Sequence, residues 1–486
     1  MIKLRKERDN SDLRKTIVYS TASGILASIY TNLGGGTFLV KYVLELGAKP
    51  FHLGLMTSIV QLSQVFQALG VFVLQIFKSR KKSVMWIIGF SRTAPFLFGM
   101  LPFLLPKPAA LFVALFILAI TTATQASAAN IWTGWIADMI PLRIRGRFFS
   151  MRNRYLMLAG MIVGYIFSTF YDLFDPNGGA IAERIKAWLG NPSFFAPENE
   201  FYALAIIFFV AVLVNILWLF VIKHQPDSPP VNNKHPFFRT LKEPLRDSNF
   251  RRLALYSIWW MFAVGIASPF WAPFMMRTLR MSLLEIQVYG TISAITSFFT
   301  LRFWGHFIDR FGNKTAMRLV IIFGGINPLV WLFATPRNYW MLFVEAASSG
   351  FMWAGANIVA QNFVLAIAPE EKKQVYSGVF AAISGLAMTT SAFLSGVFLP
   401  KPMNFFGYHL YPEQVLFLIT GLARWSAQIP LSWVYEARAL PLGVALYKVT
   451  RGPKRLRWLN IIMYRVFKNS IENHINGNGN SQGNSQ

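Results

Sequence analysis

The sequence contains no cysteine, and its acidic residues are scarce: 21 Asp and Glu stand against 47 Lys and Arg in 486 residues. Without cysteine, the chain can form no disulfide bond and can use no thiolate as a nucleophile, although this absence does not indicate a cellular compartment. Charged residues of either sign make up only 14% of the chain, whereas 54% of it is hydrophobic. We therefore do not expect a water-soluble globular protein.

Features of several other protein classes are missing as well. No GxxxxGKS/T phosphate-binding loop is present, which argues against ATP-driven transport by this chain. The six histidines are scattered without metal-ligand spacing, and nothing favours a Ser-His-Asp site, although residue order alone does not settle that point. The apolar segments are too continuous for β-barrel strands. We expect an all-α membrane protein that is not an enzyme and needs no cofactor and no metal.

Twelve apolar segments are long enough to cross a bilayer, for which a helix needs about 20 residues. The predicted spans are residues 16–42, 52–77, 83–105, 109–137, 148–171, 201–222, 252–275, 283–304, 315–335, 338–364, 375–399 and 412–436. A polar, proline-containing stretch separates six spans from six and is typical of a linker. The predicted parts are a six-helix bundle over residues 1–222, a cytoplasmic linker over 223–250, a second six-helix bundle over 251–437, and a basic amphipathic tail with a disordered end over 438–486.

The two halves resemble each other, which indicates an internal duplication. Residues 12–20 (DLRKTIVYS) resemble residues 249–257 (NFRRLALYS), and further short matches follow in the same order. The duplication also aligns NLGGG, residues 32–36 in span 1, with PFWAP, residues 269–273 in span 7. Glycine and proline both weaken helices, so we expect interruptions at these two places. They either mark a transport site or serve packing alone.

The formal charge of +26 is distributed unequally between the two sides of the predicted membrane domain. With a cytoplasmic amino terminus, the inner side carries about four times as many Lys and Arg as the outer side, which is the positive-inside pattern. The excess charge therefore indicates orientation rather than nucleic-acid binding. We expect both termini in the cytoplasm, residues 172–200 outside, an uncleaved first helix, and a location in a plasma or inner membrane.

A charged decapeptide, GHFIDRFGNK at residues 305–314, lies between spans 8 and 9. It resembles the loop signature of the major facilitator superfamily, and the matching residues are Gly305, Asp309, Arg310, Gly312 and Lys314. With the span count and the duplication, the resemblance implies two pseudo-symmetric six-helix bundles and secondary transport. The loop between spans 2 and 3, residues 74–82 (LQIFKSRKK), departs from the family pattern because it has neither aspartate nor glycine.

The resemblance also implies a role for the decapeptide. Asp309 is placed to accept hydrogen bonds from the start of a neighbouring helix, where free N–H groups and the helix dipole favour an anion. In the family-like arrangement that helix is span 5, and the partner residues of the other bundle are Arg143, Arg145, Arg147 and Arg152. These contacts would hold the inner face closed in one conformation and break in another. The alternative interpretation is a plain solvated turn.

Ionisable residues inside predicted spans are further candidates, because a charge without partners in hydrocarbon costs several kcal/mol. Glu345 in span 10 is a candidate proton carrier or ligand of a cationic solute, and Arg92 in span 3 is a candidate anion ligand. Packing is the alternative for both residues, and it is the favoured interpretation for Arg424 in span 12.

Spans 1, 4, 7 and 10 line the central cavity in the family that the sequence resembles. The polar and aromatic candidates on these spans and on span 2 are Tyr30, Asn32, Gln61, Gln64, Gln125, Asn130, Trp132, Trp259, Trp260, Trp353, Asn357 and Gln361. Such a lining suits a hydroxylated or mildly amphiphilic organic solute better than a small ion, although tryptophan at span ends commonly marks only the membrane interface.

The resulting hypothesis is a monomeric secondary active transporter that moves a small organic solute by alternating access and is coupled to protons. The alternatives are a non-transporting sensor or scaffold on the same fold, and a membrane-embedded lipid enzyme or scramblase. Residues 440–468 are basic and amphipathic, so we expect the tail to contact anionic lipid headgroups. The sequence leaves the identity of the solute and its direction of movement open.

The absence of cysteine makes the predicted orientation directly testable. Asn480→Cys is expected to react with a membrane-impermeant maleimide only after cells are opened, because the carboxy terminus is placed in the cytoplasm. Asn191→Cys is expected to react in intact cells, because residues 172–200 are placed outside. Reaction of Asn480→Cys in intact cells would contradict the predicted orientation.

Overall fold

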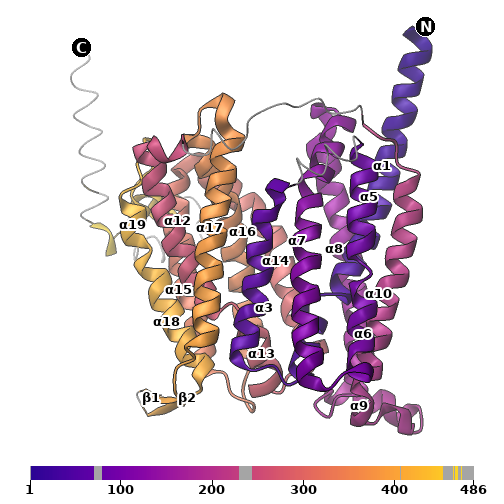
Figure 1. Cartoon of the computed structure of the whole chain (residues 1–486). Helices are drawn as coiled ribbons and strands as arrows, with labels where there is room; N and C mark the ends of the chain where they lie inside the picture. The colour runs from indigo at the N-terminus through magenta and orange to yellow at the C-terminus, as the bar shows by residue number, and fades with distance from the viewer. Residues whose placement is uncertain are drawn as a thin grey trace, which may run out of the picture.

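The computed structural model describes residues 2–69, 79–228, 243–405 and 407–451, together with positions 464, 466–468 and 472. Two groups of long helices stand side by side in it (Figure 1). Residues 2–223 are named the N-half and residues 248–450 the C-half below. The structure does not describe residues 229–242 of the predicted linker, residues 70–77 at the end of predicted span 2, or most of the tail.

The helices follow the chain in order through both halves. The N-half contains α1 (Ile2–Leu33), α2 (Gly36–Glu45), α3 (Pro50–Ser63), α5 (Arg80–Ser91), α6 (Ala94–Leu104), α7 (Lys107–Met139), α8 (Leu142–Asp172), α9 (Gly179–Trp188) and α10 (Glu200–Lys223). The C-half contains α12 (Ser248–Ala267), α13 (Trp271–Pro273), α14 (Leu283–Phe311), α15 (Asn313–Val330), α16 (Met341–Ile367), α17 (Lys373–Val397), α18 (Pro412–Ser426), α19 (Gln428–Ser432) and α20 (Leu442–Thr450). A hairpin of β1 (Met403–Phe405) and β2 (Tyr408–Leu410), which the sequence analysis did not predict, precedes α18.

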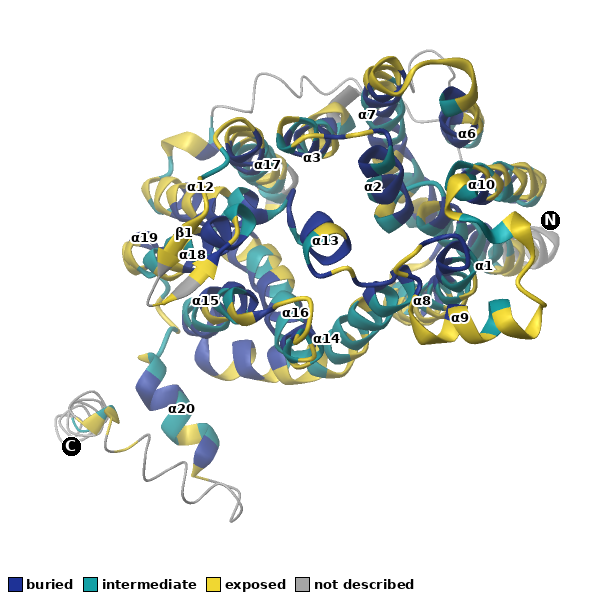
Figure 2. Cartoon of the chain, turned by 90° about the horizontal axis from the view of Figure 1, so that it is seen from below, coloured by how far each residue is buried: buried dark blue, intermediate teal, exposed yellow. Residues whose placement is uncertain are grey.

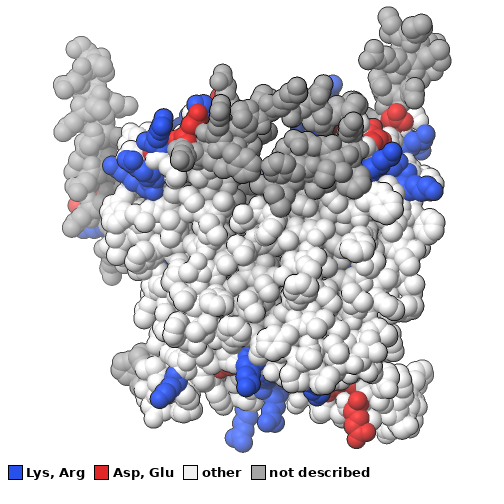
Figure 3. All heavy atoms as spheres, in the orientation of Figure 1, with Lys and Arg blue, Asp and Glu red and all other residues white. Residues whose placement is uncertain are grey.

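Nine helical segments of the described residues are long and apolar enough to cross a membrane. The described parts of predicted spans 1, 2 and 8 are helical as well, in α1 with α2, in α3 and in α14. Figure 3 shows a broad middle zone without charged side chains, between two ends where Lys, Arg, Asp and Glu gather. The prediction of an all-α membrane protein is confirmed.

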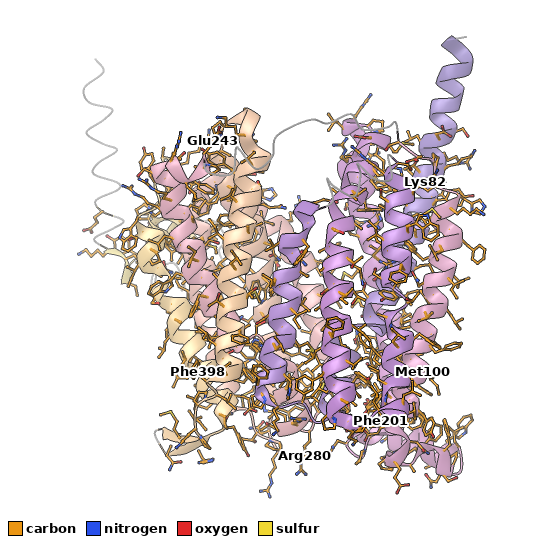
Figure 4. The ribbon with its side chains drawn as sticks, viewed as in Figure 1. Lys82, Met100, Phe201, Glu243, Arg280 and Phe398 are labelled. Atoms are coloured by element: carbon orange, nitrogen blue, oxygen red, sulfur yellow. The ribbon has the colours of Figure 1, made fainter. Side chains whose placement is uncertain are left out.

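The two ends of the molecule are distinguished by what they carry. One end, named the terminal face, carries the start of α1 and the connection from α16 to α17, whereas the opposite end, named the α9 face, carries α9 and the β1–β2 hairpin (Figure 1). Figure 4 places Lys82 and Glu243 toward the terminal face, and Phe201 and Arg280 toward the α9 face.

The helix interruptions predicted in spans 1 and 7 are present. α1 ends at Leu33 and α2 begins at Gly36, whose φ of 51° lies in the left-handed region that glycine adopts without strain. In the C-half, α12 ends at Ala267, and the short α13 leads into a π-helical segment, Phe274–Thr278. Span 3 contains a third interruption, because α5 ends just before Arg92 and α6 begins at Ala94.

The halves meet along two helix pairs, α3 with α17 and α8 with α14 (Figures 1 and 2). The first pair approaches closely because glycines face each other. A Cβ at Gly54 would lie 2.7 Å from the Cα of Gly396 and 2.7 Å from the carbonyl oxygen of Ala392. Farther along the same pair, the Ser58 hydroxyl donates to the carbonyl oxygen of Thr389 at 3.0 Å. These contacts lie in the part of the pair that is nearer the α9 face.

Candidate functional site

A buried carboxylate joins the two halves at the α9 face. Asp172 ends α8 in the N-half, and its two oxygens accept hydrogen bonds from the backbone N–H groups of Leu283 (2.8 Å) and Leu284 (2.9 Å). These N–H groups belong to the first turn of α14 in the C-half, where no carbonyl of the helix can satisfy them. The Asp172 side chain therefore caps a helix of the other half, and the helix dipole favours its negative charge there.

A second contact closes the same face. Arg277, in the π-helical segment of the C-half, donates from Nη1 to the carbonyl oxygen of Ala48 at 3.0 Å and from Nη2 to that of Leu44 at 2.9 Å. Leu44 lies in the last turn of α2 and Ala48 follows that helix in the N-half, at a helix end where carbonyl oxygens can accept further donors. Together with Asp172, this contact holds the α9 face closed.

The terminal face shows the opposite situation. Asp309 is exposed, and no hydrogen bond or ion pair to its carboxylate is found among the described residues. Arg310 is exposed as well, and a Cβ at Gly305 would meet no atom within 4 Å. Asp309 is therefore free while the α9 face is closed. The predicted role of Asp309 in closing the terminal face belongs to the other conformation and stays a prediction.

The rest of the decapeptide packs against its own half. Gly312 has a φ of 90°, which permits the tight turn between α14 and α15. Glu436 accepts hydrogen bonds from the backbone N–H groups of Asn313 (2.9 Å) and Lys314 (2.6 Å), the first two residues of α15. The Lys314 ammonium donates to the carbonyl oxygens of Ser432 (2.8 Å) and Val434 (2.7 Å). No motif in the sequence marked Glu436 as the acidic partner of this loop.

The N-half repeats this cap at the corresponding place. Of the predicted loop at residues 74–82, the structure describes residues 79–82. The carboxylate of Asp227, which follows α10, accepts from the Ser79 hydroxyl and from the backbone N–H of Lys81 at 3.2 Å. Ser79 in turn caps α5 by accepting from the N–H of Lys82 at 3.1 Å. In each half, an acidic residue that follows the last span thus caps the start of the third span.

The four arginines predicted to meet Asp309 lie in the N-half and do not meet it in this conformation. Arg143 and Arg147 are exposed at the start of α8. Arg145 donates from Nε to the carbonyl oxygen of Ile140 at 3.3 Å, which satisfies the end of α7. Arg152 is buried deeper in the half, where its Nε donates to the carbonyl oxygen of Ser20 at 3.1 Å.

A cavity of about 550 Å³ lies in the N-half, between α1, α3, α7 and α8. Two buried arginines line it: Arg92 at the interruption of span 3 and Arg152 on α8. The cavity also contains three of the predicted lining residues, Gln64, Gln125 and Trp132. Its remaining lining is mostly small hydroxyl and aliphatic side chains, and no Asp or Glu lines it among the residues that the structure describes.

Two smaller cavities of the C-half contain predicted site residues. One, of about 260 Å³, is lined by Glu345, Arg424, Tyr289 and Trp353, among others, and the Tyr289 hydroxyl donates to Glu345 Oε2 at 2.9 Å. Arg424 is buried, and its guanidinium donates to the carbonyl oxygen of Gly324 at 3.2 Å. Arg424, which the sequence analysis assigned to packing, therefore shares a cavity with Glu345.

The second C-half cavity, of about 270 Å³, is lined by the predicted residues Trp260, Trp353 and Asn357. The other predicted lining residues lie elsewhere. Tyr30 packs against Arg92, Asn32 bonds to its own helix, and Trp259 donates to the Ser426 hydroxyl at 2.9 Å. Gln61 lies near the α3–α17 contact, and Asn130 and Gln361 are exposed.

Comparisons with known proteins agree with this geometry. The family model described as Major Facilitator Superfamily matches residues 17–389 and 261–423. No curated protein sequence matches significantly. Among solved structures, the nucleoside transporter NupG is 12% identical with a TM-score of 0.61, and the match covers 87% of this chain and all of NupG. The inward-open xylose transporter XylE from E. coli is 15% identical with a TM-score of 0.58, over 87% of this chain and 96% of XylE.

A D-xylose-proton symporter is also similar, at 15% identity and a TM-score of 0.60, over 87% of this chain and 98% of that protein. At these identities the likeness to solved structures shows the fold alone.

Removal of the Asp172 carboxylate is expected to shift the protein toward the conformation that is open at the α9 face. Asp172→Asn removes the charge and places amide N–H donors near backbone N–H donors. A charge-assisted hydrogen bond contributes about 1.5–3 kcal/mol, so the population open at the α9 face should rise roughly 10- to 100-fold relative to the closed one. Two distances are measured with spin labels. The pair at positions 191 and 401 reports the α9 face, and the pair at positions 146 and 370 reports the terminal face.

Asp175→Asn is the matched control, because Asp175 lies in the same loop but pairs with Lys41 of its own half at 2.7 Å. It should leave both distance distributions unchanged, whereas Asp309→Asn should favour closure of the α9 face. Unchanged distances in Asp172→Asn would show that the carboxylate does not control the α9 face.

Proposed function

The chain belongs to the major facilitator superfamily and is therefore a membrane transporter rather than an enzyme, and we propose that it moves a small organic solute by alternating access. In this mechanism the two halves rock about a central site, which faces one side of the membrane at a time. With the predicted orientation, the conformation described here is closed outside and faces the cytoplasm.

One observation carries this proposal: the contacts between the halves are concentrated at the α9 face, while Asp309 at the terminal face has no partner among the described residues. A helix cap made by a side chain of the other half can form and break as a unit, because its two hydrogen bonds depend on one carboxylate. Polar cavities in both halves supply surfaces between which a solute can bind.

We further propose that transport is coupled to protons through Glu345. Glu345 is buried in a cavity, and two neutral donors, the Tyr289 hydroxyl and the Trp331 side chain, hydrogen-bond to its carboxyl group. Neutral donors alone do not offset the cost of burying an ionised carboxylate at this depth. Glu345 can therefore hold a proton while its cavity is closed and release the proton when the cavity is exposed to water. Arg424 in the same cavity favours the ionised form when the cavity opens to water.

The test is uptake into proteoliposomes that contain the purified protein. A panel of radiolabelled organic solutes is offered with and without an inward proton gradient. At least one solute should accumulate above equilibrium only with the gradient. A chain that moves no solute in either condition, while folded and inserted, would contradict a transport function.

Glu345→Gln separates coupling from solute movement. The amide cannot exchange a proton, so gradient-driven accumulation should fall to the equilibrium level, while exchange of labelled for unlabelled solute remains measurable. Glu370→Gln is the control, because Glu370 is exposed at the end of the same span. Accumulation at the wild-type level in Glu345→Gln would return this residue to a structural role.

A further inference from the structure

Arg92 carries a buried positive charge without an acidic partner. Its guanidinium lies between two aromatic rings, with Cζ 4.8 Å from the ring centroid of Tyr30 and 4.8 Å from that of Trp218. The residue is 8% exposed, and its Nε and Nη1 atoms are buried without a hydrogen-bond partner among the described residues. Cation–π contacts hold the guanidinium in place, and these two buried donors have no acceptor in the described protein, while the residue itself lines the cavity.

Arg152 approaches the same cavity from α8. It is 9% exposed, its Cζ lies 4.6 Å from the ring centroid of Trp132, and its Nε donates to Ser20. No hydrogen bond from its two terminal nitrogens is found among the described residues. Gly24 makes room for the side chain, because a Cβ at this position would lie 2.7 Å from Cζ of Arg152.

The two charges are not compensated by the protein. No Asp or Glu lines the N-half cavity, and neither arginine forms an ion pair among the described residues. Two cations in one cavity within a membrane domain repel each other and are costly to desolvate. An anion in the cavity would compensate both charges.

We propose that the transported solute is an organic anion, and that its phosphate, sulfonate or carboxylate group binds between Arg92 and Arg152. The inference rests on the proposed transport function and names the chemical class of its substrate. Guanidinium groups donate paired N–H bonds to such oxyanions. The side chains of Gln64 and Gln125 line the same cavity and supply donors and acceptors for the polar remainder of the solute.

Binding is measured on the purified full-length protein in detergent, at constant ionic strength, so the result does not depend on transport or coupling. The probes are inorganic phosphate, sulfate, a hexose phosphate, an aryl sulfonate and a dicarboxylate, each organic anion with its neutral parent compound. Tryptophan fluorescence follows binding, because Trp132 and Trp218 contact the two guanidinium groups, and the thermal unfolding midpoint provides a second readout. At least one anion should bind saturably and raise the midpoint, while the neutral parents should not.

The variants separate a binding role from a structural one. Arg92→Gln and Arg152→Gln should each weaken anion binding roughly 10- to 100-fold, the loss expected for a hydrogen bond to a charged group. Without anion, their unfolding midpoints should equal or exceed that of the wild type, because an uncompensated buried charge is removed. Arg154→Gln should leave anion binding unchanged, because Arg154 is an exposed arginine of α8 whose Cζ lies 5.8 Å from the ring centroid of Phe298 and which does not line the cavity.

Three results would overturn the proposal: failure of every anion to stabilise the wild type, equal binding of a neutral parent compound, or equal loss of binding in Arg154→Gln. Arg92→Lys and Arg152→Lys keep the charge and serve if a glutamine variant does not fold. They should weaken binding as well, because an ammonium cannot reproduce the paired donors of a guanidinium. A protein that transports a neutral solute but binds no anion would refute this inference and leave the proposed function intact.

Discussion

At three places in the described residues, free backbone N–H groups at a helix start are satisfied by a carboxylate that lies at or beyond the end of another helix. The origin of each carboxylate decides which parts it connects. Asp227 and Glu436 cap helices of their own halves, so each half is tied from its last span to its third. Asp172 caps a helix of the opposite half. The first two caps connect helices within one half, whereas the third connects the two halves.

The buried charges add a second constraint, which concerns what the cavities accept. The N-half cavity contains two arginines and no acid, whereas the C-half cavity contains one acid and one arginine. We therefore propose different roles for the two halves: the N-half binds an anionic group, and Glu345 in the C-half exchanges the proton. Such a division allows a charged solute and a proton to be handled at separate places while the same rocking motion exposes both.

The sequence predicted the features that depend on local residue chemistry. Apolar length predicted the helices, and the glycines at 34–36 and the prolines at 269 and 273 predicted the interruptions. It did not predict the Asp172 cap, because a contact between residues so far apart in the chain leaves no local signal. Nor could it tell that Trp259 bonds to Ser426 and that Gln361 is exposed, because lipid and protein interior are equally apolar and the hydrophobic pattern does not fix how a helix is rotated.

Alternating access of the N-half cavity is the central claim, and one measurement tests it most directly. Thr133 lines this cavity, and Thr133→Cys would be the only cysteine of the chain. Its rate of alkylation by a membrane-impermeant reagent is measured separately from each face in oriented vesicles. The account predicts fast reaction from the terminal face and slower reaction from the α9 face, with the slower rate increased by Asp172→Asn. Reaction from the terminal face alone, even in Asp172→Asn, would contradict alternating access.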